Sequence, residues 1–241
     1  MYAGTPAAMR AFFWILQKQF PVEHSAKSPQ DASVRAEVTR YIPLSPASPP
    51  PRSGGETRIM LYIRKGDITR FSGDVIVNAA STRLHHGGGV CGAIHRAAGP
   101  ELLTECRTHI RHHGNLPVGT AVLTSPGKLP CRGVIHAVGS RWLFGVYAER
   151  QDGLLAQAYR RALQLARDNG FRSIAFPCIS TGHYFYPHKR AAGIALRSIT
   201  AFLADTAPEM DVHCFCFSNR DLLIYRRMTE ECDHLFLTNA T

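Results

Sequence analysis

The stretch VIVNAASTRLHHGGGVCGAIHRAAG at residues 75–99 decides the fold. It begins with the apolar run Val75–Val77, which is typical of a strand buried on both faces. The glycines 87–89 follow, and residues 93–98 then have the composition of a helix. A strand, a glycine-rich loop and a helix in this order present unpaired backbone N–H groups to an anion at the positive end of a helix dipole. A flexible glycine turn between two elements is the alternative interpretation.

Strand-like and helix-like segments alternate on both sides of this stretch. We expect strands at residues 59–63, 75–79, 119–124, 133–138, 173–180 and 212–217. We expect helices at residues 90–110, 147–169, 188–203 and 221–232. Because the strands are nearly continuous in apolar residues, helices must cover both faces of their sheet. The sequence therefore predicts an α/β protein with a mostly parallel or mixed sheet, whose ligand lies beyond the carboxyl ends of the strands.

The first 55 residues differ in composition from the rest of the chain. Residues 9–20 are mostly apolar, and no acidic residue precedes Glu23. Such a segment resembles a mitochondrial transit peptide, or it is a helix that packs on the domain. Residues 43–55, PLSPASPPPRSGG, have the composition of a linker. We therefore expect an N-terminal extension and linker at residues 1–55 and one domain at residues 56–236.

The composition limits the classes of partner. The formal net charge of +10 favours anionic partners, but the basic residues are scattered, so a nucleic-acid partner is not expected. The seven cysteines include no CxxC pair, which indicates reduced thiols in an intracellular protein. No apolar run reaches the roughly eighteen residues that span a bilayer, so no membrane partner is expected either.

Motifs at five places follow the order and spacing of one known family. They are GDIT at 66–69, VNAA at 77–80, GGGV with GAIHRAAGP at 87–100, VIHAVG at 134–139 and STG at 180–182. Together they resemble the macrodomain family over residues 59–232. The segments RYIPL at 40–44 and FPCISTG at 176–182 are similar to its MacroD-type branch.

The resemblance implies a fold and a function. The fold is a three-layer α/β/α sandwich with a central mixed, mostly parallel sheet. Macrodomains bind ADP-ribose, and many hydrolyse it from acidic side chains of modified proteins or deacetylate O-acetyl-ADP-ribose. The implied partners are ADP-ribose and ADP-ribosylated proteins, the implied state is a monomer, and no cofactor and no metal are expected. The compartment would be the mitochondrion if the N-terminal segment is a targeting signal, and otherwise the cytoplasm or nucleus.

The resemblance also assigns binding roles by position. Asp67 is expected to accept a hydrogen bond from the adenine amino group beside the Ile68 backbone, although a turn or cap role is the alternative. Phe217 is expected to pack against the adenine ring, with a plain core position as its alternative. Tyr184 would lie over the distal ribose, and Asn78 would hold the loop that follows its strand.

Two loops would hold the diphosphate from opposite sides with their backbone N–H groups. Their residues are Gly88, Gly89, Val90, Cys91 and Gly92 in the first loop and Ser180, Thr181, Gly182, His183 and Tyr184 in the second.

Three positions depart from the branch. Ser81 stands where active members carry Asn, which binds the distal ribose, and Cys91 stands where they carry Asp, which helps orient or deprotonate the attacking water. A thiol is a poor replacement for a carboxylate, and losing a general base costs roughly 10²–10⁴-fold in rate. Water held by the ligand's own phosphate would then carry the hydrolysis. Phe185, where the branch usually has Gly, would narrow the distal-ribose pocket.

Other roles remain open for several histidines and cysteines. His183 would be an alternative base if its side chain faces the ribose, or it points aside while its backbone binds. Cys91 would be a nucleophile if one of His85, His86 or His95 served as its base.

A second cluster has the spacing of a helical zinc site, with a solvated helix end as the alternative. Its residues are Cys106, His109, His112 and His113.

The sequence thus supports two functions. One is a mono-ADP-ribosyl-protein hydrolase that also acts on O-acetyl-ADP-ribose, with Ser81, Cys91 and His183 as the candidate catalytic residues. The other is a reader that binds ADP-ribose or ADP-ribosylated proteins with little turnover.

Overall fold

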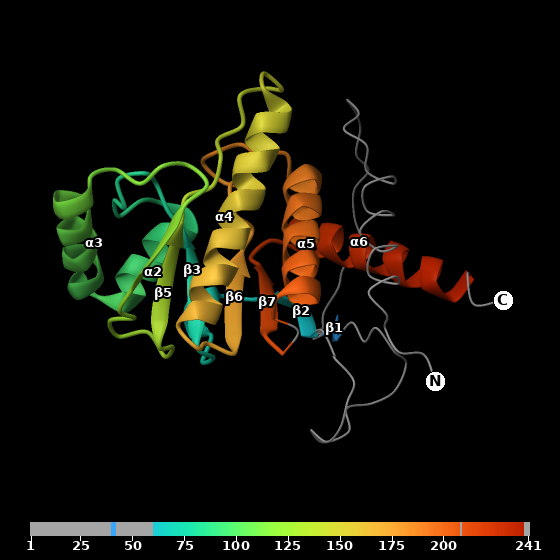
Figure 1. The fold of residues 1–241 in the computed structure, drawn as a ribbon, viewed down its shortest axis with the longest axis horizontal. Helices are drawn as coiled ribbons and strands as arrows, with labels where there is room; N and C mark the ends of the chain where they lie inside the picture. The colour runs from blue at the N-terminus through green and yellow to red at the C-terminus, as the bar shows by residue number, and fades with distance from the viewer. Residues whose placement is uncertain (1–39, 42–59, 208, 239–241) are drawn as a thin grey trace.

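A mixed β-sheet forms the centre of the molecule (Figure 1). The computed structural model describes residues 40–41, 60–207 and 209–238. Within them, seven strands have the order β1-β2-β7-β6-β3-β5-β4. They are β1 (Arg40–Tyr41), β2 (Met60–Lys65), β3 (Val75–Ala79), β4 (Ala121–Thr124), β5 (Gly133–Ala137), β6 (Ser173–Pro177) and β7 (Asp211–Cys216). The edge strands β1 and β4 pair antiparallel and all other pairs are parallel, which confirms the prediction of a mixed, mostly parallel sheet.

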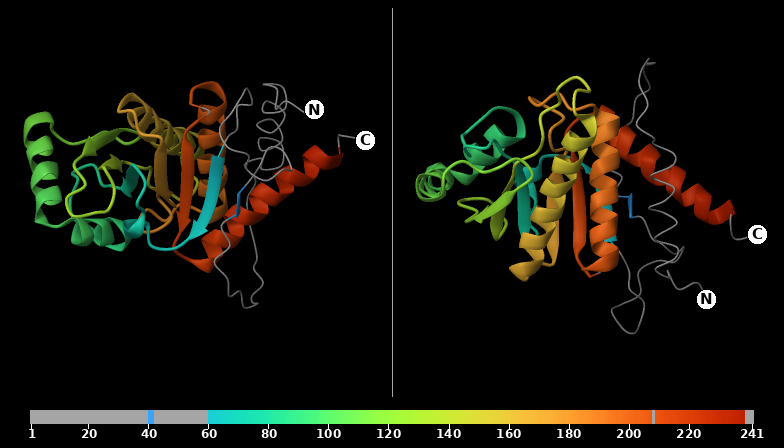
Figure 2. Two further views of the ribbon diagram at one scale, coloured as in Figure 1. Left: turned by 90° about the horizontal axis from the view of Figure 1, so that it is seen from below. Right: turned by 45° about the horizontal axis from the view of Figure 1, so that its top comes forward.

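Helices cover both faces of this sheet (Figures 1 and 2). They are α2 (Gly89–Ala98), α3 (Pro100–His113), α4 (Ala148–Asp168), α5 (His188–Asp205) and α6 (Asn219–Thr238), with the short 3-10 helix η1 (Ile68–Arg70). Helices α4 and α5 lie side by side on one face, with α6 against α5, and α2 and α3 cover the opposite face. The three-layer α/β/α sandwich is therefore confirmed.

Strand β3 shows why both faces must be covered. Val75 and Val77 belong to the hydrophobic core under α4 and α5, whereas Ile76 belongs to the core under α2 and α3. All three side chains are fully buried. Because side chains alternate across a strand, one apolar run supplies both cores.

The prediction of a single helix at residues 90–110 is wrong, because two helices lie there. Helix α2 ends at Ala98 and is capped by Gly99, whose φ of 88° lies in a region open to glycine, and α3 begins at Pro100. Proline has no N–H to continue the preceding helix but suits the first position of the next one. The chain therefore turns between α2 and α3.

The N-terminal predictions fall almost entirely outside the described residues. These are the targeting or packing helix at 9–20, the linker at 43–55 and most of the segment 40–44. Residues Arg40 and Tyr41 are described, and their backbone pairs with β2 opposite Ile63 and Tyr62. The division between residues 55 and 56 stays a prediction. In the described part of the chain, no helix is both long and apolar enough to cross a membrane.

Candidate functional site

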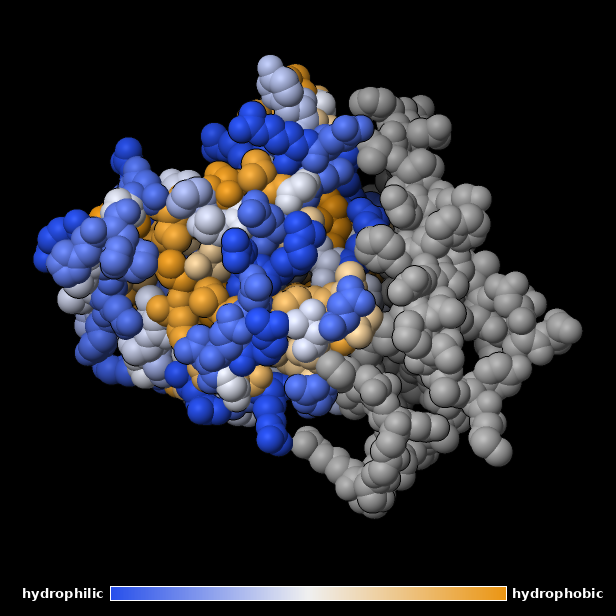
Figure 3. Space-filling view, viewed as in Figure 1, coloured by the Kyte–Doolittle hydropathy of each residue, from blue (hydrophilic) through white to orange (hydrophobic). Residues whose placement is uncertain are grey.

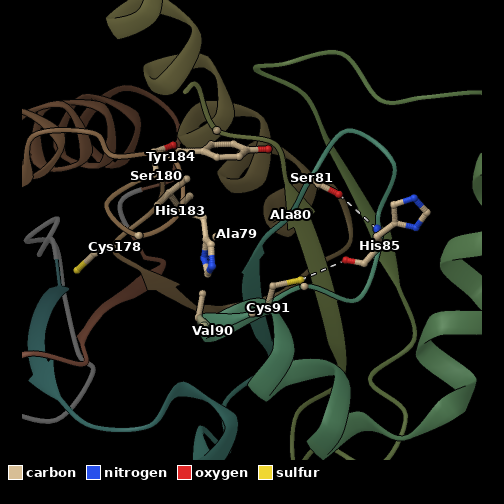
Figure 4. Close-up of a pocket in the computed structure, with 16 residues that line it drawn as sticks. Ala79, Ala80, Ser81, His85, Val90, Cys91, Cys178, Ser180, His183 and Tyr184 are labelled. Atoms are coloured by element: carbon tan, nitrogen blue, oxygen red, sulfur yellow. Dashed lines mark hydrogen bonds between the residues drawn. The ribbon is translucent and has the colours of Figure 1, made fainter. Parts of the chain in front are cut away.

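A cavity of about 420 Å³ opens at the carboxyl ends of β3 and β6 (Figure 4). It lies between a first loop (residues 87–92), which runs into α2, and a second loop (residues 178–185), which follows β6. The lining comprises residues 79–81, 85, 87–91, 139, 178–180 and 182–184. The two loops that the sequence assigns to a diphosphate therefore face one cavity.

The first loop is shaped by close backbone contacts. Gly88 caps the N-terminus of α2, and Gly89 has a φ of 57°. A Cβ atom on Gly92 would lie only 2.4 Å from the carbonyl oxygen of Gly87, so only glycine fits there. The first turn of α2 carries no acidic side chain. Its free N–H groups and the positive end of the helix dipole thus present an uncompensated anion site.

The second loop has a strained backbone at its centre. Ser180 has a φ of 71°, which is unusual for a residue other than glycine. Its carbonyl oxygen accepts a hydrogen bond from Tyr186 N, and its buried hydroxyl has no hydrogen-bond partner within the described residues. Gly139 lies directly beneath, because a Cβ atom there would be 2.3 Å from Ser180 Oγ. Strain and an unpaired polar atom in a cavity wall are both typical of a ligand-binding loop.

His183 points into the cavity rather than aside (Figure 4). Its imidazole lies against the first loop, since a Cβ atom on Gly88 would be 2.9 Å from His183 Cε1. The side chain therefore extends from the second loop to the first, across the space expected to hold a diphosphate. Tyr184 lines the same cavity, and the guanidinium of Arg141 is 5.8 Å from the centre of its ring.

Ser81 and Cys91 are held by one residue, His85 (Figure 4). The backbone N–H of His85 donates to Ser81 Oγ over 3.3 Å, and the thiol of Cys91 donates to the carbonyl oxygen of His85 over 3.5 Å. Asn78 Nδ2 lies 3.6 Å from Cys91 Sγ. These contacts of the thiol involve no imidazole, which argues against the Cys91 nucleophile with a histidine base. Both departures from the branch nevertheless line the cavity.

The residues expected at the adenine lie beside the cavity, outside its lining. Asp67 follows β2 and Phe217 follows β7, and these neighbouring strands end together, where Gly66 N donates to Cys216 O over 3.2 Å. The carboxylate of Asp67 accepts hydrogen bonds from the N–H and the hydroxyl of Thr69, so its cap role is present. Phe217 is 85% exposed, which excludes its core alternative.

The remaining predicted residues lie next to the cavity but are not part of its lining. Ile68 is buried in the core beneath α2, and Gly92 lies one residue past the lining. The Thr181 hydroxyl donates to Cys178 O over 2.9 Å within the second loop. Asn78 is fully buried and lies 3.0 Å from His136 Nδ1, so it connects β3 with β5 as well as with the first loop.

Exposed apolar side chains surround the second loop. Phe144 and Tyr147, in the segment that precedes α4, are 90% and 71% exposed, and Phe185 is 69% exposed. Trp142 N donates to Tyr184 O over 2.8 Å, which ties this segment to the cavity wall. The segment lies at the top of the view in Figure 3, where apolar (orange) atoms stand beside hydrophilic (blue) ones. We call residues 143–147 together with Phe185 the apolar rim.

The comparisons with known proteins agree with this arrangement. The family model described as "Macro domain" matches residues 77–195, which include both loops. The O-acetyl-ADP-ribose deacetylase of Klebsiella pneumoniae (strain 342) is 52% identical to this chain over 163 residues, or 68% of this chain and 92% of the relative.

Two solved structures are similar as well. The Oceanobacillus iheyensis macrodomain with ADP has a TM-score of 0.69 and 43% identity, and the match covers 73% of this chain and 93% of that one. The Trypanosoma brucei macrodomain in complex with ADP-ribose has a TM-score of 0.61 and 40% identity, covering 69% of this chain and 68% of that one.

Proposed function

We propose, because this chain belongs to the Macro domain family and resembles its MacroD-type branch, that it binds ADP-ribose and hydrolyses esters at the distal ribose. The observation that carries the proposal is the cavity between the two loops. One wall is the N-terminus of α2, and the other is the strained second loop. A diphosphate between them would accept hydrogen bonds from both loops, which suits its charge and its length.

The ligand would follow the edge of the sheet. The diphosphate would occupy the cavity, the distal ribose would lie near Ser81 and Tyr184, and the adenosine would extend toward Asp67 and Phe217. This direction follows the carboxyl ends of β3, β6, β7 and β2, which are adjacent in the sheet. His183 must turn out of the cavity, or donate to the phosphate, when the ligand enters.

The proposed reaction is hydrolysis of O-acetyl-ADP-ribose to ADP-ribose and acetate. Relatives with about half of their residues identical to this chain are named for that activity. Because the Cys91 thiol is engaged with the His85 carbonyl, we assign the positioning of the attacking water to the ligand's phosphate. This assignment predicts a slow enzyme, since a general base contributes roughly 10²–10⁴-fold.

A second substrate class is a protein that carries ADP-ribose on Glu or Asp. The apolar rim supports it, because large exposed apolar side chains beside a cavity are typical of a protein-binding surface. A modified acidic side chain would reach the distal ribose while its own protein contacts the rim.

A reader with little turnover is the alternative function. The observation in its favour is the pair of departures, Ser81 and Cys91, both in the cavity wall. Incubating the protein with O-acetyl-ADP-ribose and with a Glu/Asp-mono-ADP-ribosylated protein separates the two. Acetate or ADP-ribose release above the uncatalysed rate supports the enzyme. Saturable ADP-ribose binding without release supports the reader and overturns the hydrolase.

A further inference from the structure

We propose that His95, Cys106 and His136 form a zinc site in the core beneath the first loop. His95 and Cys106 come from α2 and α3, which cover one face of the sheet, and His136 comes from β5, a strand of that sheet (Figure 1). Their side chains are buried, with exposures of 4%, 0% and 0%. The site lies behind the cavity wall, and the proposal does not depend on what the cavity binds.

The geometry of the three side chains suits a tetrahedral ion. One ligand atom from each residue can be chosen so that all three lie within 4.8 Å of one another. Cys106 Sγ and His136 Nε2 are 3.6 Å apart. Zinc with bonds of about 2.3 Å to sulfur and about 2.0 Å to nitrogen places two such atoms about 3.6 Å apart. The pair of Cys106 and His136 is therefore at coordination distance already, and His95 would have to move closer to bind the same ion.

The unpartnered ring of His95 is a second observation, separate from the distances, that points to a metal ion. Its ring is buried, yet neither Nδ1 nor Nε2 has a hydrogen-bond partner among the described residues. A buried polar group without a partner is costly and rare in folded proteins. A metal ion between His95 and its two neighbours would satisfy one ring nitrogen directly.

Asn78 orients the ring of His136. Its Nδ2 lies 3.0 Å from His136 Nδ1, while its buried Oδ1 has no partner within the described part of the chain. With the amide turned by 180°, Oδ1 would accept a hydrogen bond from His136 Nδ1–H, and Nδ2 would become the atom without a partner. The lone pair of His136 Nε2 would then be free for a metal, and a histidine ligand commonly donates its other N–H in this way.

The donor set selects the ion. His95, Cys106 and His136 are all buried, and a neutral imidazole offers one nitrogen lone pair to a metal. Zinc would displace the thiol proton of Cys106 to solvent as the Zn–S bond forms. Two imidazoles and one thiolate are a set that zinc prefers over magnesium or calcium.

A fourth ligand and a compensating charge are both close. Thr124 Oγ1 lies 2.9 Å from His136 Nε2, so this hydroxyl or a water molecule can complete the tetrahedron. The carboxylate of Glu105, next to Cys106, accepts hydrogen bonds from Ser125 N and Oγ, which places a negative charge one residue from the site. Zinc would then link α2 and α3 to the sheet and fix the helix that carries the first loop.

The surface histidines of α3 are the competing zinc ligands. His109 and His113 lie with ring centres 4.7 Å apart, while Cys106 on the same helix faces the core. Cys106 therefore does not lie with the histidines that helical spacing groups it with. It lies close to His95 and His136 instead.

The test uses the full chain, purified in the presence of zinc and then dialysed. Elemental analysis measures zinc per chain, and cobalt substitution measures the thiolate-to-metal absorption band. We expect one equivalent, and a rise of about 5–10 °C in the unfolding midpoint at free zinc near 100 times the dissociation constant. Cys106→Ser should lose the band, and His95→Gln should lose the stoichiometric metal. The double variant H109Q/H113Q, which keeps the core site, should retain both.

Two outcomes would overturn the proposal. One is wild-type protein that takes up neither zinc nor cobalt. The other is metal that persists in Cys106→Ser and disappears in H109Q/H113Q. Circular dichroism of each variant checks that it is folded, and the wild-type cobalt spectrum decides the question if a core variant does not fold.

Discussion

The thiol of Cys91 donates its hydrogen bond to the backbone carbonyl oxygen of His85. His85 belongs to the segment that links β3 to α2, and Cys91 lies in the first turn of α2, so the thiol ties that segment to the helix. A group that donates its proton to a carbonyl does not act as a base toward water at the same time. The position where the resemblance to active MacroD-type members leads us to expect Asp is therefore occupied by a residue with a structural contact.

Replacing Cys91 by Asp should increase hydrolysis. A carboxylate in the cavity wall supplies the missing base, so we expect a rise of roughly tenfold or more in kcat for O-acetyl-ADP-ribose. Acetate release measures it. Cys91→Asn is the matched control, since it has the same shape without an ionisable group. Equal rates for the two variants would show that the carboxylate is not what the site lacks.

Gly92→Ala should weaken ADP-ribose binding. The added methyl group would lie 2.4 Å from the Gly87 carbonyl oxygen and push the first loop away from the diphosphate. We expect at least a tenfold loss of affinity by calorimetry and destabilisation of about 1–3 kcal/mol. Gly153→Ala in α4 is the control, because its Cβ meets nothing within 4 Å. That change should leave affinity unaltered and stabilise the helix by about 0.5–1 kcal/mol.

Asp74 should stabilise the fold in a pH-dependent way. Burial alone would raise the pKa of its carboxyl, but the hydrogen bond from Arg132 and those from the N–H groups of Arg172 and Ser173 lower it overall. A folded pKa below the unfolded value gives stability that is present above about pH 4 and is lost as the pH falls through the folded pKa.

Asp74→Asn should therefore lower the free energy of unfolding by about 1–2 kcal/mol at pH 7. The difference from wild type should shrink below pH 4, as followed by urea denaturation. Asp168→Asn, which breaks an exposed ion pair with Arg167, should change stability by less than about 0.5 kcal/mol. A deficit in Asp74→Asn that is the same at pH 3 and pH 7 would contradict this account.

The apolar rim should matter only for protein substrates. Phe144→Ser should reduce ADP-ribose release from a modified protein several-fold, because the exposed ring would no longer contact the partner. Its effect on O-acetyl-ADP-ribose should be small. Leu223→Ser on α6, also exposed, is the control. Equal losses of activity on both substrates would contradict a role limited to protein substrates and would show that Phe144 supports the structure of the cavity.

Much of this fold could be predicted from local sequence. The strand at Val75–Ala79 and the helix at Ala148–Asp168 lie within one residue of expectation, because an apolar run and a clear helical period fix them. The break at Gly99–Pro100 was missed because the apolar pattern continues across it. Gly and Pro in succession are strong signals of a helix boundary, and here they outweigh the apolar pattern.

The site could be predicted only in part. Glycines mark the two loops in the sequence, so the two walls of the cavity can be predicted from it. The direction of His183 depends on the left-handed backbone of Ser180, which no sequence period shows. The meeting of His95, Cys106 and His136 depends on three elements that only the tertiary fold brings together. One signal for it was available: a histidine at position 136 inside an otherwise apolar, fully buried strand.

Calorimetric titration of the full chain with ADP-ribose tests the central claim most directly. The account predicts saturable binding of one ADP-ribose per chain, with affinity at least tenfold weaker in Gly92→Ala and unchanged in Gly153→Ala. Absence of saturable binding by the folded wild-type protein, or equal affinity in all three proteins, would contradict the assignment of the cavity between the two loops as the ADP-ribose site.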